Sequence, residues 1–207
     1  TTVDHGVVYH DENGNGARDA AEDGIENVLV SNGSDVVATD AEGRYSLDVT
    51  DDTTVFVIQP KGWQAPVNEH NLPRFFYVHK PSGSPEGLEF PGLAPTGPLP
   101  ESIDFPLVRS DVGTVFSMFA FGDPQPYTLE DVDYYRRDIV EEAMEMEGPV
   151  VGVTLGDIVG DDLDLFDPIN EATAMMGLPW WHVYGNHDMN FDVEEDKHAD
   201  ETFERVY

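Results

Sequence analysis

The 207-residue sequence contains no cysteine, which excludes disulfide bonds and thiolate metal sites. Basic residues are also scarce: 10 Lys and Arg stand against 42 Asp and Glu, giving a formal net charge of −32. A surface this negative repels phosphate backbones and anionic lipids, so we expect no binding to nucleic-acid backbones. No apolar run approaches the length that crosses a bilayer, so no membrane span is expected.

Two explanations of this acidity are open. The carboxylates can attract divalent cations at particular sites, or they can adapt the whole surface to concentrated salt, which screens their mutual repulsion. The chain has only three lysines, Lys61, Lys80 and Lys197, and this scarcity favours the second explanation. We therefore hypothesise a halophilic source.

The first half of the chain is rich in short β-type runs separated by turns. Five such runs lie within residues 1–58, and their spacing is typical of an antiparallel sandwich. Residues 59–111 are crowded with Pro and Gly but hold aromatic residues that need burial, so we predict a long ordered loop that closes with a strand over 102–108. Residues 1–111 are therefore predicted to form an N-terminal antiparallel β-sandwich.

A polar loop near the start, DENGNGARDAAE over residues 11–22, matches the calcium-loop consensus D-x-[DN]-x-[DN]-G-x5-E. Because strands flank it on both sides, a helix-flanked EF-hand is not expected. The alternative is a Gly-rich polar turn, but all the consensus positions match, and this favours calcium binding with a structural role. The predicted ligands are Asp11, Asn13, Asn15, Ala17 through its backbone carbonyl, Asp19 and Glu22.

From about residue 112, strand and helix patterns alternate. This order predicts a parallel α/β sheet, whose strands read as continuous apolar runs because both faces are covered. The predicted strands are 114–122, 148–157 and 178–188, and the predicted helices are 128–148 and 165–177.

Helix 128–148 has a clear start and a clear buried stripe. Thr128 can cap its first turn, with Asp131 three residues later as a capping-box variant. Apolar residues recur at helical spacing to form the stripe: Val132, Tyr135, Ile139, Val140 and Ala143.

Each of the three predicted strands ends in polar residues of the kind that bind metals. The first leads into FGDPQ, the second into LGDIVGDD and the third into YGNHD. The carboxyl ends of parallel strands meet at one edge of a sheet, so these groups can converge. Hard oxygen ligands with some imidazole suit Mn, Fe, Zn or Mg. One Gly-Asp after a strand is as readily a turn as a ligand, but three such motifs in this order indicate a metal site.

The series GD…GDxxxD…GNHD resembles that of the calcineurin-like metallophosphoesterases, a four-layer α/β family that holds two metals. The resemblance implies that Asp123 binds the first metal, that Asp157 bridges both and that Asn186 binds the second. It also implies that His187 contacts the phosphate as an acid or charge stabiliser, with Asp188 orienting its ring.

This sequence departs from the family pattern in two ways. Gln125 stands where the family usually has a histidine, although its amide oxygen can also bind a metal and a subset of the family carries this DPQ form. The later histidine ligands, including a Gly-His-x-His, do not occur before Tyr207. We therefore expect residues 112–207 to be the first half of a catalytic domain, inactive by itself but derived from a competent parent.

Several neighbouring residues have a second interpretation. We expect His182, Trp180 and Trp181 to be packing residues, and His198 to lie on the surface. Asp161 is expected beside the metal ligands rather than among them.

The predicted fold class is thus a two-domain α+β protein: an antiparallel β-sandwich over 1–111, then a partial α/β metallophosphoesterase fold (β-α-β-α-β) over 112–207. The sandwich and its loop resemble the B-repeat and carboxypeptidase-regulatory-like domains of bacterial surface proteins, which implies export, with a signal peptide outside this chain. The favoured function is hydrolysis of a phosphate-ester substrate by two divalent metals. The alternatives are a non-catalytic binding module and a calcium-stabilised surface domain.

Overall fold

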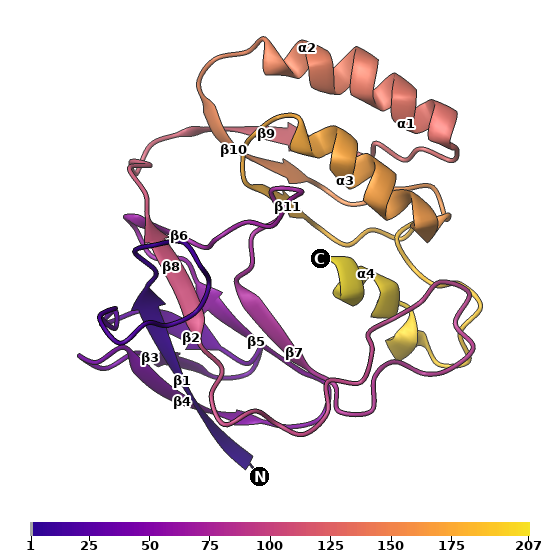
Figure 1. The fold of residues 1–207 in the computed structure, drawn as a ribbon. Helices are drawn as coiled ribbons and strands as arrows, with labels where there is room; N and C mark the ends of the chain where they lie inside the picture. Colours follow the sequence, from indigo (N-terminus) through magenta and orange to yellow (C-terminus); the bar gives the residue numbers. More distant parts are fainter. Residues whose placement is uncertain (1) are drawn as a thin grey trace. The chain divides into compact units, whose positions relative to one another are not determined.

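The computed structural model describes residues 2–207, with side chains from His5 onward, and divides the chain into two compact units (Figure 1). The first unit comprises Thr1–Pro66, Arg74–Gly83 and Pro95–Thr114, and the second comprises Val67–Pro73, Ser84–Ala94 and Val115–Tyr207. Two short segments from the first half of the sequence therefore belong to the second unit.

The first unit contains two four-stranded sheets. One has the order β4-β1-β8-β6, formed by β4 (Arg44–Val49), β1 (Thr2–His10), β8 (Phe105–Arg109) and β6 (Trp63–Gln64). The other has the order β3-β2-β5-β7, formed by β3 (Val36–Ala38), β2 (Leu29–Ser31), β5 (Thr53–Ile58) and β7 (Phe76–His79).

Apolar side chains from both sheets share one core. Strand β4 alternates between exposed and buried residues along its whole length, as expected when only one of its faces is buried. Leu47 from β4 and Phe105 from β8 meet Val30 from β2 and Val57 from β5 in this core. The core therefore holds the two sheets together.

Two details of the first unit differ from the sequence prediction. Strands β1 and β8 pair in parallel, so an all-antiparallel arrangement was wrong at this pair. Strands β6 and β7 lie in the segment predicted as loop, where the high content of Pro and Gly hid two short pairing runs.

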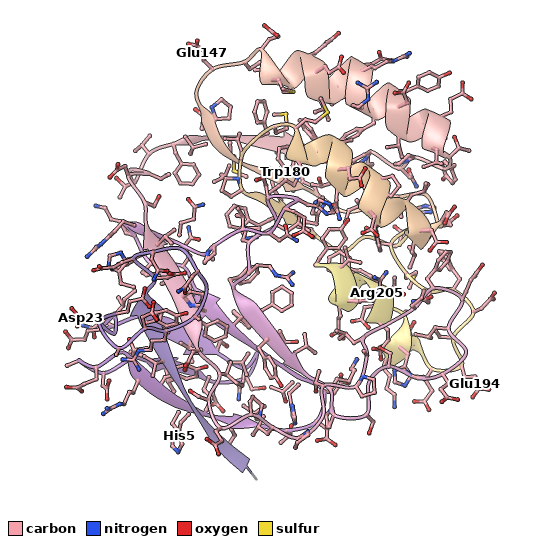
Figure 2. The ribbon with its side chains drawn as sticks, viewed as in Figure 1. His5, Asp23, Glu147, Trp180, Glu194 and Arg205 are labelled. Carbon is pink, nitrogen blue, oxygen red and sulfur yellow. The ribbon has the colours of Figure 1, made fainter. Side chains whose placement is uncertain are left out.

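The second unit is built on a three-stranded parallel sheet in the order β11-β10-β9. Its strands are β9 (Ser117–Phe121), β10 (Pro149–Thr154) and β11 (Trp180–His182). The predicted parallel β-α-β-α-β order is confirmed. Phe119 and Trp180 pack with Ala143 on the helix-covered side of the sheet, where Figure 2 labels Trp180.

The predicted helix 128–148 consists of α1 (Leu129–Tyr135), a π-helical turn (Arg136–Val140) and α2 (Glu141–Met144). Thr128 caps α1 as predicted, accepting a hydrogen bond from the Asp131 backbone N–H. Ile139 is 44% exposed, so its place in the predicted stripe was wrong, whereas Val140 is fully buried. The π turn explains the change, because it rotates the following residues away from regular α spacing.

The predicted strand over 114–122 is shorter and less covered than expected. Strand β9 begins at Ser117, and Val115 ahead of it is 93% exposed. Met118, which alternates with buried Phe119, is 48% exposed. The prediction that both faces of this strand are covered was therefore wrong for the described residues, where helices pack on one face.

The rest of the second unit comprises a 3-10 turn (Leu163–Leu165), α3 (Phe166–Ala174), a second 3-10 turn (Asp196–His198) and α4 (Glu201–Val206). The segment Ser84–Ala94 is hydrogen-bonded to α4. Arg205, labelled in Figure 2, donates from Nε to the Pro91 carbonyl at 2.8 Å. Across residues 2–207, no helix is both long and apolar enough to cross a membrane.

Candidate functional site

The three strand-end motifs meet around Asp157. Its backbone carbonyl accepts a hydrogen bond from the Gln125 N–H at 3.1 Å, and its carboxylate oxygen Oδ1 accepts one from the His187 N–H at 3.1 Å. A further bond at 2.9 Å, from the Gly160 N–H to the Pro126 carbonyl, ties the first motif to the second. The parallel sheet therefore brings the three predicted motifs to one place.

Four motif residues have a left-handed backbone. The φ angles are 28° at Asp123, 46° at Gln125, 48° at Asp157 and 73° at Asp161. This region is uncommon outside glycine, and each such residue costs roughly 1–3 kcal/mol that the surrounding structure must offset. Sequence reasoning missed this feature. The available signal was the frequency of Asp, which tolerates left-handed backbone better than most residues.

The motif glycines allow the loops to approach one another closely. A Cβ on Gly185 would lie 2.1 Å from the Asp157 backbone nitrogen and 2.3 Å from its Oδ1. Gly156 has φ +96°, and its position lies against Gly185. The second and third motifs can therefore meet only because both positions lack a side chain.

His187 is held by Asp161. Its ring nitrogen Nδ1 lies 2.6 Å from Asp161 Oδ1, and this hydrogen bond raises the pKa of the imidazole above its usual value. The negative charges of Asp161, Asp157 and Asp188 act in the same direction, and partial desolvation opposes them. The arrangement favours a protonated ring.

The Asp188 carboxylate contacts the backbone of the second and third motifs. The residue that contacts the His187 ring is Asp161, and the orientation of this ring by Asp188 stays a prediction. The Asp188 carboxylate is fully buried and accepts hydrogen bonds from the backbone N–H groups of Val159 (3.1 Å) and Gly185 (2.9 Å). Burial raises its pKa, while the backbone donors act against the rise. Asp188 thus joins the second and third motif loops.

The donor types at this edge of the sheet suit a hard divalent cation, but they form only part of a ligand set. Asp123 and Asp157 offer carboxylate oxygens, and Gln125 and Asn186 offer amide oxygens. Within residues 2–207, no group of three or more His, Asp or Glu side chains is placed to hold a metal ion. The predicted dinuclear centre therefore has four candidate oxygen donors here, two of which are charged.

The ring nitrogens of His182 are buried without hydrogen bonds. Its ring lies 4.4 Å from the Tyr207 ring, and neither ring nitrogen has a hydrogen-bond partner. Burial lowers the pKa of His182 to about 3.

Trp180 is a packing residue as expected. It is 1% exposed, and its Nε1 donates to Thr154 Oγ1 at 2.9 Å. His198 is not a free surface residue, because its Nδ1 lies 2.7 Å from buried Glu201.

The loop over residues 11–22 lies in the first unit and is folded around Asp11. The Asp11 carboxylate is 2% exposed and accepts hydrogen bonds from the N–H groups of Gly14, Asn15 and Gly16. Glu22 is 6% exposed and accepts from the Glu12 N–H through one oxygen and the Asp19 N–H through the other. The two ends of the loop are thereby closed by carboxylates.

Backbone N–H groups hold the two end carboxylates of this loop. Within the described part of the chain, neither Asp11 nor Glu22 forms an ion pair. Burial raises the pKa of the neighbouring Tyr9 to about 12, and the charges of Asp11 and Glu22 add to the rise. The amides of Asn13 and Asn15 both donate to Asp19 Oδ2, at 2.7 and 3.2 Å.

Comparison with protein-family models finds a similarity over part of the chain. Residues 12–94 match the family model described as the N terminal of Calcineurin-like phosphoesterase. This match confirms the resemblance to calcineurin-like phosphoesterases, and it does so through a region that precedes all three strand-end motifs. The resemblance of the same region to B-repeat and carboxypeptidase-regulatory-like sandwiches stays a prediction. A search of curated proteins found no match.

Proposed function

We propose that this protein is a metal-dependent phosphoesterase, in which the second unit contributes part of a dinuclear catalytic centre. The observation that supports this function most strongly is the meeting of three strand-end motifs around Asp157, with four motif residues held in left-handed backbone. Backbone strain of this kind concentrates at active sites. The family match of residues 12–94 supports the same class of activity.

The residues that would hold the metals in this proposal are Asp123, Gln125, Asp157 and Asn186. Two divalent cations, Mn, Fe, Zn or Mg, supply Lewis acidity when bound and lower the pKa of the water that attacks phosphorus. The cations and their phosphate-ester substrate require further ligands, so we propose that turnover belongs to the full-length parent and that residues 1–207 are inactive by themselves.

His187 acts on the phosphate. Because Nδ1 faces Asp161, the other ring nitrogen is left to donate a hydrogen bond to a phosphate oxygen or to protonate the leaving group. The raised pKa favours the protonated ring, which suits charge stabilisation. Asp188 supports the chemistry indirectly, by fixing the loop that carries His187.

The test is an assay of the full-length protein on 4-nitrophenyl phosphate with Mn²⁺, comparing wild type with Asp157→Asn. Loss of the bridging charge should lower kcat at least 100-fold. The matched control is Asp164→Asn, an exposed carboxylate in the 3-10 turn after the second motif, which should leave the rate within twofold. Equal rates for wild type and Asp157→Asn would remove Asp157 from catalysis and favour the non-catalytic alternative.

We propose a second, structural site for calcium in the loop over residues 11–22. The observation that supports it is the presence of two buried carboxylates, Asp11 and Glu22, without a basic partner in the described chain, at the first and last positions of a full consensus match. Buried charge of one sign is normally paired or bound to a metal. Two Asn among the ligands lower the charge of the site, which implies a modest affinity for calcium. Such an affinity suits the millimolar calcium outside cells, and we therefore also propose export.

Thermal unfolding with and without Ca²⁺ tests this site. At 100 times its dissociation constant the ion should add about 2.7 kcal/mol to the free energy of unfolding. The gain should be lost in Glu22→Gln and kept in Glu12→Gln, because the Glu12 side chain is 67% exposed and lies outside the consensus positions. An equal gain in both variants would place the calcium elsewhere.

A further inference from the structure

Tyr127 is an exposed aromatic residue fixed beside the candidate site. It follows the DPQP sequence of the first motif, and 53% of it is exposed. Its backbone N–H donates to Asp131 Oδ2 at 3.1 Å, and the hydroxyl of Thr128 donates to the same oxygen at 2.9 Å. The capping group of α1 therefore fixes the backbone from which this ring projects.

The ring itself packs on a glycine of the second motif. A Cβ on Gly160 would lie 2.7 to 2.8 Å from three atoms of the Tyr127 ring, so the ring occupies space that any other residue would fill. The Gly160 N–H also donates to the carbonyl of Pro126, the residue before Tyr127, at 2.9 Å. Isolated exposed apolar residues are common on proteins, but Tyr127 is held at both its backbone and its ring.

This position connects the ring to the reacting groups. Gly160 directly precedes Asp161, whose carboxylate lies 2.6 Å from His187 Nδ1. Gln125, two residues before Tyr127, is hydrogen-bonded to the Asp157 carbonyl. The ring therefore stands on the first- and second-motif loops, with part of its surface open to solvent. These loops carry predicted metal ligands and Asp161, the carboxylate that contacts the predicted phosphate-contacting histidine.

We infer that Tyr127 is a specificity-determining residue that stacks on a planar aromatic ring in the leaving group of the substrate. The inference rests on the proposed phosphoesterase function and names the substrate class: phosphate esters of aromatic alcohols or of nucleosides. Stacking is the appropriate interaction, because a rigid aromatic residue offers a flat apolar surface at low entropic cost and tolerates different rings. Small alkyl phosphates cannot use this surface.

The experiment measures kcat and KM of the full-length protein with Mn²⁺ on phenyl phosphate, adenosine monophosphate and ethyl phosphate. Tyr127→Ala should raise KM about tenfold for at least one aromatic ester, with kcat changed less than twofold and ethyl phosphate unaffected. Tyr127→Phe should behave as wild type, because the ring and not the hydroxyl makes the contact. The matched control is Tyr134→Ala, an exposed tyrosine of α1 that is bonded to Glu130.

The two aromatic esters separate two sources of the ring. An effect on phenyl phosphate alone places the ring next to the ester oxygen, and an effect on adenosine monophosphate alone places it one sugar away; either supports the inference. An equal loss on ethyl phosphate, or no loss on either aromatic ester, overturns it while the phosphoesterase function stands.

An inactive wild-type protein would overturn the proposed function, and a binding measurement would then decide the role of Tyr127. Calorimetric titration with phenylphosphonate and ethylphosphonate in the presence of Mn²⁺ reports on the same contact without turnover. Preference for the phenyl compound that is lost in Tyr127→Ala supports the stacking surface. Equal affinity of wild type for the two compounds overturns it.

Discussion

At the residue scale, the candidate site depends on positions where a side chain is missing as much as on positions where one is present. Gly185 permits the contact between the third motif and Asp157, and Gly160 makes room for Tyr127. Asp157 adopts a positive φ that few residues accept. These requirements give the motif glycines, and an aspartate at position 157, a structural reason in addition to any metal binding.

Gly185→Ala should destabilise the second unit by roughly 1–3 kcal/mol, the usual cost of overpacking, because the new Cβ would collide with the backbone and carboxylate of Asp157. Chemical denaturation of the 207-residue chain measures the change. Gly122→Ala is the matched control, since its Cβ would meet nothing within 4 Å. A Gly185→Ala protein as stable as the control would show that the two loops do not need this close approach.

His182 makes a second prediction at this scale. Its pKa is about 3 in the folded protein and near 6.5 in the unfolded chain, so the unfolded state binds more protons between these values. The contribution of neutral His182 is therefore fully present above pH 6.5 and is lost as the pH falls, by about 1.4 kcal/mol per pH unit. The substitution His182→Leu removes this loss of stability at low pH, because leucine does not titrate.

The measurement is the free energy of unfolding of wild type and His182→Leu at pH 7.5 and 5.5. The titrating carboxylates are common to both proteins and cancel in the difference, so the variant should gain about 1.4 kcal/mol relative to wild type at the lower pH. A difference between the two proteins that does not vary with pH would mean that the ring is hydrated in solution.

At the scale of elements, the spacing of apolar residues predicted the strands and helices that bury one face at regular intervals. The parallel order of β9, β10 and β11 followed from alternating apolar runs and an amphipathic helix, and the cap at Thr128 followed from local hydrogen-bond chemistry. Exposed Ile139 could not be predicted, because a π turn leaves no mark in apolar spacing. Strand β7 was missed because its pairing with β5 is a tertiary contact that involves a segment rich in Pro and Gly.

The motif residues were identified from their residue types and their positions after predicted strands. Their left-handed backbone and the contact between Asp161 and His187 could not be predicted, because both depend on how the loops pack.

The segment Ser84–Ala94, predicted as part of a long loop in residues 59–111, lies on α4. Fully buried Glu201 accepts from the Ser84 hydroxyl at 2.5 Å and bonds to the His198 ring at 2.7 Å. The Leu93 N–H donates to the same Ser84 hydroxyl. One carboxylate thus joins three parts of the second unit.

Glu201→Ala should therefore cost roughly 1–3 kcal/mol, because it leaves buried polar partners unsatisfied. The loss should be local: hydrogen exchange of the Leu93 amide should accelerate more than that of amides in β10. Glu194→Ala, at an exposed acidic residue labelled in Figure 2, should change neither quantity. Uniform acceleration across the second unit would instead indicate that Glu201 contributes to global stability without specifically holding this segment.

At the scale of the whole molecule, the net charge of −32 governs behaviour in salt. The few cations are used locally: Lys80 is 8% exposed and pairs with Asp52 at 2.9 Å, and Arg136 pairs with Asp133 at 2.6 Å. They cannot neutralise the remaining carboxylates, whose repulsion acts on the folded state more strongly than on the expanded unfolded chain. The Debye length falls from about 10 Å at 0.1 M to about 3 Å at 1 M salt, so concentrated salt removes most of this repulsion.

The midpoint of thermal unfolding should therefore rise by at least about 5 °C between 0.1 and 2 M KCl, equivalent to roughly 2 kcal/mol for a chain of this size. A calcium chelator in all samples excludes a contribution from the loop over residues 11–22. Tetramethylammonium chloride should act as well as KCl, because screening depends on ionic strength and not on a coordinating cation. A rise that occurs with Mn²⁺ or Ca²⁺ but not with either monovalent salt would assign the acidity to particular cation sites and contradict the halophilic explanation.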